Sequence, residues 1–194
     1  MESVRETAKK ILESIANEMD AVKDAEIGDF LRLLLNSRNV YVAGAGRTGL
    51  AAKAFAMRLM HVELNVYVVG ETITPSIKPG DLLIAMSGSG KTSSVLIVAE
   101  TAKKMGVKVA AITSFRDSPL AKLADCIVVI GGRRMGGNED YTKRQLTGEH
   151  EPLTPLGTLF ELSLNIFLDS VISELMKIFR KGEQELKRKH SNLE

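Results

Sequence analysis

One stretch of the sequence concentrates hydroxyl and glycine residues, AMSGSGKTSS at positions 85–94. It follows LLIAM, an apolar run typical of a buried strand, and precedes a helical pattern. Its hydroxyl and glycine positions are Ser87, Gly88, Ser89, Gly90, Thr92 and Ser93. Hydroxyls at a helix N-terminus stand beside free backbone N–H groups, and glycines let the chain approach a ligand closely. The stretch therefore predicts a cradle for a phosphate group, although a serine cap with a glycine turn would explain any one of these residues alone.

The same stretch does not favour a nucleotide hydrolase. Gly90, Lys91 and Thr92 complete the end of the P-loop pattern G-x-x-x-x-G-K-[ST], but Ala85 occupies the position of its first glycine. None of the later apolar runs ends in the aspartate that such enzymes use to hold Mg²⁺. The pattern therefore indicates a bound phosphate without indicating a nucleotide.

An earlier loop, Gly44–Gly49, matches the dinucleotide fingerprint G-x-G-x-x-G between an apolar run and a helix. Glu71 lies just past the next apolar run, where an acidic residue could bind a ribose. A tight glycine turn for close strand–helix packing explains the same residues. One dinucleotide would also leave the loop at 85–94 unexplained, so NAD(P) binding is the less favoured alternative.

Five short apolar runs, rich in β-branched residues, predict the strands that must position these loops. They are Val40–Ala43, Val66–Val69, Leu82–Met86, Val107–Ile112 and Ile127–Ile130. Two N-terminal helices are expected first, at Val4–Val22 and Ile27–Leu35. Four further helical patterns separate or follow the apolar runs: Leu50–Met60, Ser93–Met105, Pro119–Ala124 and about Leu156–Phe179. This alternation predicts an α/β fold, a three-layer α/β/α sandwich around a five-stranded parallel sheet, with ligands at the carboxyl ends of the strands.

The composition predicts one cytoplasmic domain with a substantial core. The chain has 194 residues, 44% of them hydrophobic, no apolar run long enough to cross a bilayer, and a start too charged for a secretion signal. Its 26 basic and 24 acidic residues are mixed along the sequence, which argues against the basic footprint of a nucleic-acid binder. Cys126, the single cysteine, is expected to be a buried thiol without redox chemistry. The expected partner is a small anion, not a membrane or a nucleic acid.

The segment 131–153 has no strong periodicity, and a loop of this length is usually functional or mobile. His150 stands between Glu149 and Glu151, but three consecutive residues do not converge on one metal ion, so no metal site is expected. Four basic residues of the segment could attract phosphate or be solvated: Arg133, Arg134, Lys143 and Arg144. The charged residues 181–194 are expected to form a surface helix or a subunit contact.

Three segments together resemble the sugar isomerase (SIS) domain family: GAGRTG, MSGSGKTSS and TPLGTLFE. MRLMH, VVGETITP, PLGTLFE and KHSNLE resemble the 6-phospho-3-hexuloisomerases within that family, so the likeness extends from about Val40 to Glu194. The resemblance implies a single SIS domain over residues 1–194, with N-terminal helices at 1–37, an α/β core at 38–180 and a tail at 181–194. It also implies the flavodoxin-like strand order 2-1-3-4-5.

The resemblance further implies an activity. It is the interconversion of 3-hexulose 6-phosphate and fructose 6-phosphate in the ribulose monophosphate pathway, by a homotetramer with sites near subunit interfaces and no metal or redox cofactor. Matching motifs assign seven residues to the substrate, of which the last four are phosphate ligands: Gly46, Arg47, Thr48, Ser87, Gly88, Ser89 and Thr92. Relatives often carry Ser at position 48 and an acidic residue at position 91. Thr48 keeps the hydroxyl, and Lys91 adds a positive charge that is compatible with phosphate binding.

Two residues are assigned to proton transfer. Moving the carbonyl from C3 to C2 requires removal of the C2 proton, which the C3 ketone acidifies, and delivery of a proton to C3. Glu161 matches the catalytic acid of the family and could serve both steps, although a solvated helix glutamate is the ordinary alternative. His61 is assigned the transfer between the two substrate oxygens. The alternative for His61 is a helix cap, and in relatives such a histidine can reach a neighbouring subunit's site.

Two other functions fit the same motifs. An isomerase for a different phosphorylated aldose or ketose would differ only in the shape of its pocket. A non-catalytic SIS sensor would bind a sugar phosphate and regulate a partner. Glu161 favours catalysis over the sensor.

Overall fold

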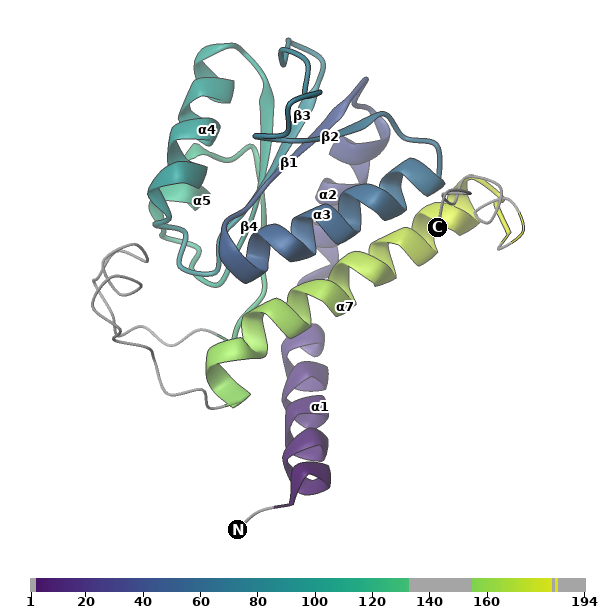
Figure 1. The fold of residues 1–194 in the computed structure, drawn as a ribbon, viewed down its shortest axis with the longest axis vertical. Helices are drawn as coiled ribbons and strands as arrows, with labels where there is room; N and C mark the ends of the chain where they lie inside the picture. The colour runs from purple at the N-terminus through teal and green to yellow at the C-terminus, as the bar shows by residue number, and fades with distance from the viewer. Residues whose placement is uncertain (1–2, 133–154, 183, 185–194) are drawn as a thin grey trace.

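The computed structural model describes residues 3–132, 155–182 and 184 of the chain. Its centre is a parallel sheet of five strands in the order β2-β1-β3-β4-β5 (Figure 1). The strands are β1 (Val40–Ala43), β2 (Val66–Val68), β3 (Leu82–Met86), β4 (Lys108–Thr113) and β5 (Cys126–Val129). The predicted α/β class, parallel sheet and strand order are confirmed, and no strand end differs from its prediction by more than one residue.

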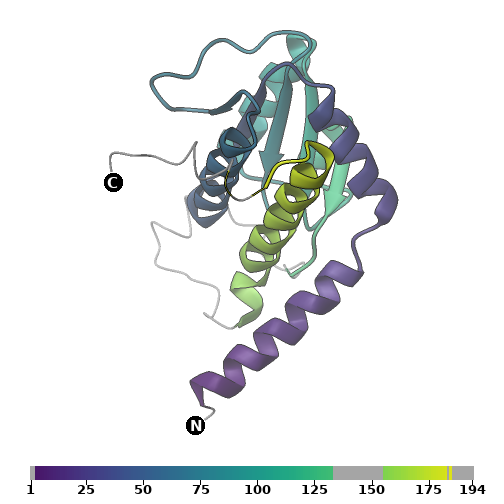
Figure 2. The same cartoon turned by 90° about the vertical axis from the view of Figure 1, so that its right-hand side faces the viewer.

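Helices cover both faces of the sheet (Figure 1, Figure 2). They are α1 (Val4–Asp20), α2 (Asp24–Leu35), α3 (Gly46–His61), α4 (Ser93–Lys104), α5 (Pro119–Leu123) and α7 (Pro155–Ile178). Successive side chains of a strand point to opposite faces. Val42 and Ile84 pack in the core beside α2, α3 and α7, whereas Tyr41 and Leu83 pack in the core beside α4 and α5. The sheet is therefore the middle of three layers, as predicted.

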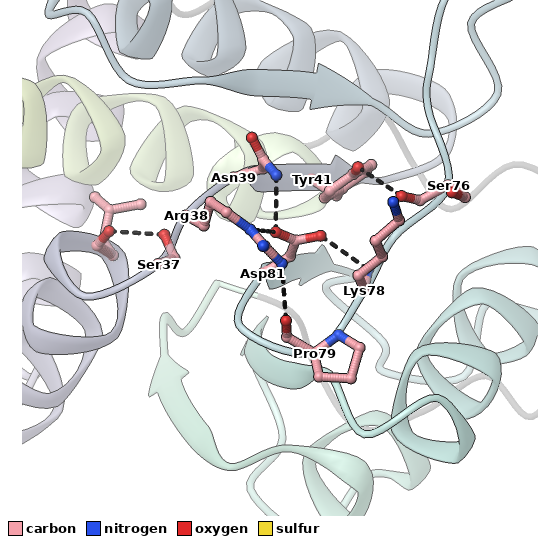
Figure 3. A network of polar contacts seen from close by, with 9 residues as sticks. Ser37, Arg38, Asn39, Tyr41, Ser76, Lys78, Pro79 and Asp81 are labelled. Carbon is pink, nitrogen blue, oxygen red and sulfur yellow. Dashed lines mark hydrogen bonds and ion pairs between the residues drawn. The ribbon is translucent and has the colours of Figure 1, made fainter.

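The connection from β2 to β3 contains no helix among its residues 69–81. It crosses the face of the sheet on which α4 and α5 lie. Tyr41 Oη donates a hydrogen bond to the Ser76 carbonyl oxygen at 3.3 Å, and Ile77 packs against the same core (Figure 3). The connection thus covers part of the sheet where a helix would otherwise lie.

A buried carboxylate fastens the amino-terminal edge of the sheet. Asp81, which is 2% exposed, accepts hydrogen bonds from Asn39 Nδ2 and from the Lys78 N–H, each at 2.8 Å (Figure 3). Arg38 Nε lies 3.4 Å from the same carboxylate, and its Nη2 donates to the Pro79 carbonyl oxygen at 2.9 Å. Asn39 precedes β1 and Asp81 precedes β3, so the network joins the starts of two neighbouring strands. It stands at the edge opposite the one where ligands are expected.

Helix α1 extends from the body of the fold (Figure 2). It begins with a capping box, in which Ser3 Oγ accepts from the Glu6 N–H and the Glu6 carboxylate accepts from the Ser3 N–H. Ile15 is buried, whereas Val4 and Leu12 are 88% and 65% exposed. Across the described parts of the chain, no helix is both long enough and apolar enough to span a membrane.

Candidate active site

The strand order creates a switch point between β1 and β3, which are neighbours in the sheet. The chain leaves β1 toward α3 on one face and leaves β3 toward α4 on the other (Figure 1). Ligands of parallel α/β sheets bind at such points. Both helices begin without a side-chain cap, because Ala45 and Thr92 make no side-chain hydrogen bond to the first turn. The first-turn N–H groups of α3 and α4 are therefore available to an anion.

The loop between β3 and α4 brings its hydroxyls to one point. Ser87 Oγ lies 2.8 Å from Thr92 Oγ1 and 3.5 Å from Ser89 Oγ, and it accepts a hydrogen bond from the Gly90 N–H at 3.1 Å. Ser87 and Gly88 are buried, whereas Ser89 and Thr92 are half-buried and remain reachable. The four predicted phosphate ligands thus lie in one tight turn at the N-terminus of α4. We call residues 87–92 the serine loop.

The first glycine loop is a place of close strand–helix packing. A Cβ atom on Gly49 would lie 2.9 Å from the Gly44 carbonyl oxygen, and one on Gly44 would lie 3.0 Å from the Thr48 carbonyl oxygen. These contacts account for the G-x-G-x-x-G pattern without a dinucleotide. Glu71, the candidate ribose ligand, is paired with Lys53, whose Nζ lies 2.6 Å from its Oε1.

Gly46, Arg47 and Thr48 form the first turn of α3, which starts four residues earlier than the predicted Leu50. Gly46 has a φ of 57°, a left-handed conformation that glycine adopts without strain. Gly46 and Arg47 are exposed, whereas Thr48 is buried. The guanidinium of Arg47 therefore stands in solvent at the same edge of the sheet as the serine loop.

Glu161 lies in the second turn of α7. The residue is half-buried, and its Oε2 atom is buried without a hydrogen-bond partner in the part of the chain that the structure describes. A buried carboxylate oxygen that lacks a donor is costly unless a ligand supplies one. The position therefore differs from that of an ordinary solvated helix glutamate.

The orientation of Glu161 follows from the packing of α7. Phe167 on the same helix contacts Phe30 of α2, with ring centroids 5.9 Å apart. Helical geometry places Glu161 about 120° around the helix from Phe167, on a flank turned away from α2. Helices α3 and α7 run side by side in the same direction (Figure 1). Glu161 therefore lies near the edge of the sheet at which α3 begins.

The exit of β5 packs against the same turn of α7. Gly132 has a φ of 92°, and a Cβ atom there would lie 2.8 Å from the Phe160 backbone nitrogen and 2.9 Å from Leu159 Cγ. Only glycine permits this approach without displacement. The contact fixes the turn that carries Glu161 relative to the sheet.

The structure does not bring His61 to the other predicted residues within one chain. It is the last residue of α3, is 3% exposed, and lies about 22 Å along the helix axis from Gly46. Lys181, just past the end of α7, donates to the neighbouring Val62 carbonyl oxygen at 2.9 Å. His61 therefore stands beside the C-terminal ends of α3 and α7, whereas Glu161 stands near their N-terminal ends.

Three contacts at the carboxyl edge were not predicted from the sequence. Buried Glu26 of α2 accepts a hydrogen bond from the Val129 N–H at 2.8 Å and forms an ion pair with Arg116. The Ser114 N–H donates to the Gly88 carbonyl oxygen of the serine loop at 3.1 Å. The sequence signal for this segment is the polar run TSFRDS directly after the apolar run that became β4.

The other residues considered from the sequence add little to this site. Seven residues weighed from the sequence lie outside the described residues: Arg133, Arg134, Lys143, Arg144, Glu149, His150 and Glu151. Among those that are described, no three His, Cys, Asp or Glu residues group closely enough to hold a metal ion. Cys126 is buried in β5 as predicted, and burial, with added repulsion from Asp29 and Glu26, raises the pKa of its thiol to about 11.

Residues 33–134 match the model of the SIS domain family. The chain is similar to an uncharacterized protein of Aeropyrum pernix, with 48% identity over 99% of this chain and 91% of that protein. It is also similar to the 3-hexulose-6-phosphate isomerase of Bacillus subtilis, with 39% identity over 97% of this chain and 98% of that protein. A solved structure from Methanococcus jannaschii, described as inferring a function of 3-hexulose-6-phosphate isomerase, matches with a TM-score of 0.76 at 32% identity over 97% of each chain.

Proposed function

The chain belongs to the SIS domain family and is a phosphosugar isomerase, and we propose that it interconverts 3-hexulose 6-phosphate and fructose 6-phosphate. The observation that carries the proposal is the buried Oε2 atom of Glu161, which has no hydrogen-bond partner among the described residues and lies near the edge of the sheet that holds the serine loop. Relatives that bear the name of this isomerase and are 39% identical over nearly the whole chain support the choice of sugar.

The phosphate group is held by the serine loop. Ser87, Ser89 and Thr92 supply hydroxyls, and the uncapped N-terminus of α4 supplies backbone N–H groups and the positive end of its dipole. Charge-assisted hydrogen bonds of this kind fix the ester end of the substrate. Gly46, Arg47 and Thr48 at the start of α3 contact the substrate from the neighbouring strand.

Glu161 transfers the proton between carbon atoms. In 3-hexulose 6-phosphate the C3 ketone acidifies the C2–H bond. The carboxylate takes that proton to form an enediol and returns a proton to C3, while the hydroxyl proton on O2 passes to O3. Only protons and the double bond move, so the reaction requires no redox cofactor. Because O6 is phosphorylated, the 3-ketose cannot close a five-membered ring and reacts in its open-chain form.

We assign the transfer between the two oxygens to His61 of a neighbouring subunit. His61 lies at the far end of α3 from its own serine loop, which supports a role outside its own site. The outer face of α3 also exposes three apolar side chains, of Leu50, Met57 and Met60, at 68%, 45% and 41%. Exposed apolar residues on one helix face favour association between subunits. The proposed assembly is a homotetramer of single SIS domains over residues 1–194, acting in the cytoplasm in the ribulose monophosphate pathway.

Proton exchange in D₂O tests the reaction and the choice of sugar together. The protein is incubated in D₂O with a panel of pentose and hexose phosphates, and deuterium at C1, C2 and C3 is followed by NMR. We expect turnover and exchange at C2 and C3 of the 3-hexulose 6-phosphate and fructose 6-phosphate pair. Faster exchange with an aldose phosphate, at C1 and C2, would assign the enzyme to a different phosphorylated sugar.

A further inference from the structure

Residues 113–120, from the end of β4 into α5, hold the serine loop by donating hydrogen bonds to carbonyl oxygens of the loop. The Ser114 N–H donates to the Gly88 carbonyl oxygen at 3.1 Å, and the Leu120 N–H donates to the Gly90 carbonyl oxygen at 3.1 Å. Thr113 Oγ1 also approaches the Gly88 carbonyl oxygen, at 3.4 Å. Two carbonyl groups of the loop, those of Gly88 and Gly90, are thus tied to residues 113–120. The sequence motifs had not connected residues 113–120 with phosphate binding.

These ties decide where the backbone donors of the loop point. In a trans peptide the carbonyl and the following N–H are directed to opposite sides. A Gly88 carbonyl that faces β4 therefore turns the Ser89 N–H away from β4. A Gly90 carbonyl that faces α5 turns the Lys91 N–H away from α5 and toward Ser89 Oγ, to which it donates at 3.2 Å. Donors oriented before the ligand arrives bind an anion without a cost of reorganisation.

Ser118 fixes the first turn of α5, whose Leu120 N–H holds the Gly90 carbonyl. It is the N-cap of α5, where its Oγ accepts a hydrogen bond from the Ala121 N–H at 3.2 Å, and it is 4% exposed. Helix α5 has five residues, so its first turn, which contains the Leu120 N–H, depends strongly on the cap. Ser118 also touches Gly90 directly, because a Cβ atom on Gly90 would lie 2.2 Å from Ser118 Oγ.

The connection continues into the phosphate ligands. Gly90, with a φ of 61°, donates its N–H to Ser87 Oγ at 3.1 Å, and Ser87 Oγ is the atom that lies 2.8 Å from Thr92 Oγ1. A shift of Gly90 would therefore move the hydroxyl at the centre of the loop.

We infer that Ser118 is a positioning residue for the phosphate, acting through the α5 cap and Gly90 without touching the substrate. The inference rests on the proposed phosphate site in the serine loop. Loss of the cap should weaken binding of any phosphate ester while leaving the proton transfer at Glu161 unchanged. Its signature is a higher KM and a higher Kd with an unaltered kcat.

The test compares Ser118→Ala with Ser3→Ala in the full-length protein. Both changes remove a serine N-cap hydroxyl, and Ser3 caps α1, away from the serine loop. The dissociation constants of inorganic phosphate and fructose 6-phosphate are measured by titration calorimetry, and kcat and KM by turnover. Exchange of the Leu120 amide with D₂O gives a second readout that does not depend on activity.

We expect Ser118→Ala to raise both dissociation constants and KM about fivefold, to leave kcat within about a factor of two, and to speed exchange at Leu120. Ser3→Ala should leave all five values unchanged. Equal phosphate affinity in Ser118→Ala and the parent protein would overturn the inference while leaving the phosphate site intact. Failure of the parent protein to bind fructose 6-phosphate would overturn the site and the inference together.

Discussion

The hydroxyl oxygens of Ser87 and Thr92 lie 2.8 Å apart, across the turn that joins β3 to α4. One of the two hydroxyls donates to the other, and both can rotate to direct their protons toward an oxyanion. The pair also draws the ends of the serine loop together at the first turn of an uncapped helix. This relationship suits the serine loop to the proposed role of a phosphate site.

Replacing Ser87 with alanine should weaken substrate binding more than catalysis. The change removes a hydrogen bond to a charged group, so KM for fructose 6-phosphate should rise about tenfold to a hundredfold. The free energy of unfolding should fall by about 1 kcal/mol, because Ser87 Oγ also forms a hydrogen bond with Thr92 Oγ1 and shares the Gly90 N–H with the Ser87 carbonyl oxygen. Steady-state kinetics and urea unfolding measure the two effects. Ser170→Ala, an exposed serine on α7, is the control and should change neither.

Glycines 49 and 28 should respond oppositely to alanine. A Cβ atom on Gly49 would meet the Gly44 carbonyl oxygen at 2.9 Å, so Gly49→Ala should lower the free energy of unfolding by about 1–3 kcal/mol. Gly28 is exposed within α2 with no atom within 4 Å of its Cβ position, so Gly28→Ala should raise that free energy by about 0.5–1 kcal/mol. Urea unfolding measures both. If Gly49→Ala is as stable as the parent protein, the close packing of strand and helix is wrong.

Ser163→Ala should stabilise the protein. The Ser163 hydroxyl is fully buried and has no hydrogen-bond partner in the described part of the chain. Removing an unsatisfied polar group from the core should raise the free energy of unfolding by about 1 kcal/mol. Thermal and urea unfolding measure the change. A loss of stability would mean that the hydroxyl has a partner in solution.

Cys126 should be unreactive until the protein unfolds. Burial raises the pKa of its thiol from 9.0 to about 11, so the thiolate that reacts with disulfide reagents is scarce near pH 8. The folded state binds this proton more tightly than the unfolded state. The resulting stabilisation is complete below pH 9 and is lost as the pH rises toward about 11. Labelling with a coloured disulfide reagent should be slow in buffer and fast in urea, and rapid labelling of the native protein would contradict this.

The sequence was sufficient to predict the sheet and the serine loop because both depend on local patterns. Runs such as Leu82–Met86 have the length and apolar character of strands buried on both faces, and the hydroxyls of Ser87 and Thr92 follow such a run directly. The strand order came from family resemblance, since apolar runs alone do not specify which strands pair.

The sequence could not predict contacts that depend on tertiary packing. Ser118 touches Gly90 only because α5 folds back beneath the serine loop, and Glu26 reaches Arg116 across 90 residues. The burial of Glu161 Oε2, which lacks a partner within the described ranges, likewise depends on how α7 lies beside α3. The sequence predicted His61 only as a residue at the end of a helix. Its distance from the serine loop follows from the full length of α3, which begins at Gly46 and ends at His61.

Glu161→Gln is the most direct test of proton transfer by this carboxylate. Glutamine keeps the shape of the side chain but cannot accept a carbon-bound proton, so kcat should fall about a hundredfold to ten-thousandfold while the Kd of fructose 6-phosphate stays within about threefold. Glu174→Gln, on the same helix with an exposed pairing to Lys177, is the matched control and should retain full kcat. If Glu161→Gln turns over as fast as the control, Glu161 is not the base and the proposed mechanism is wrong.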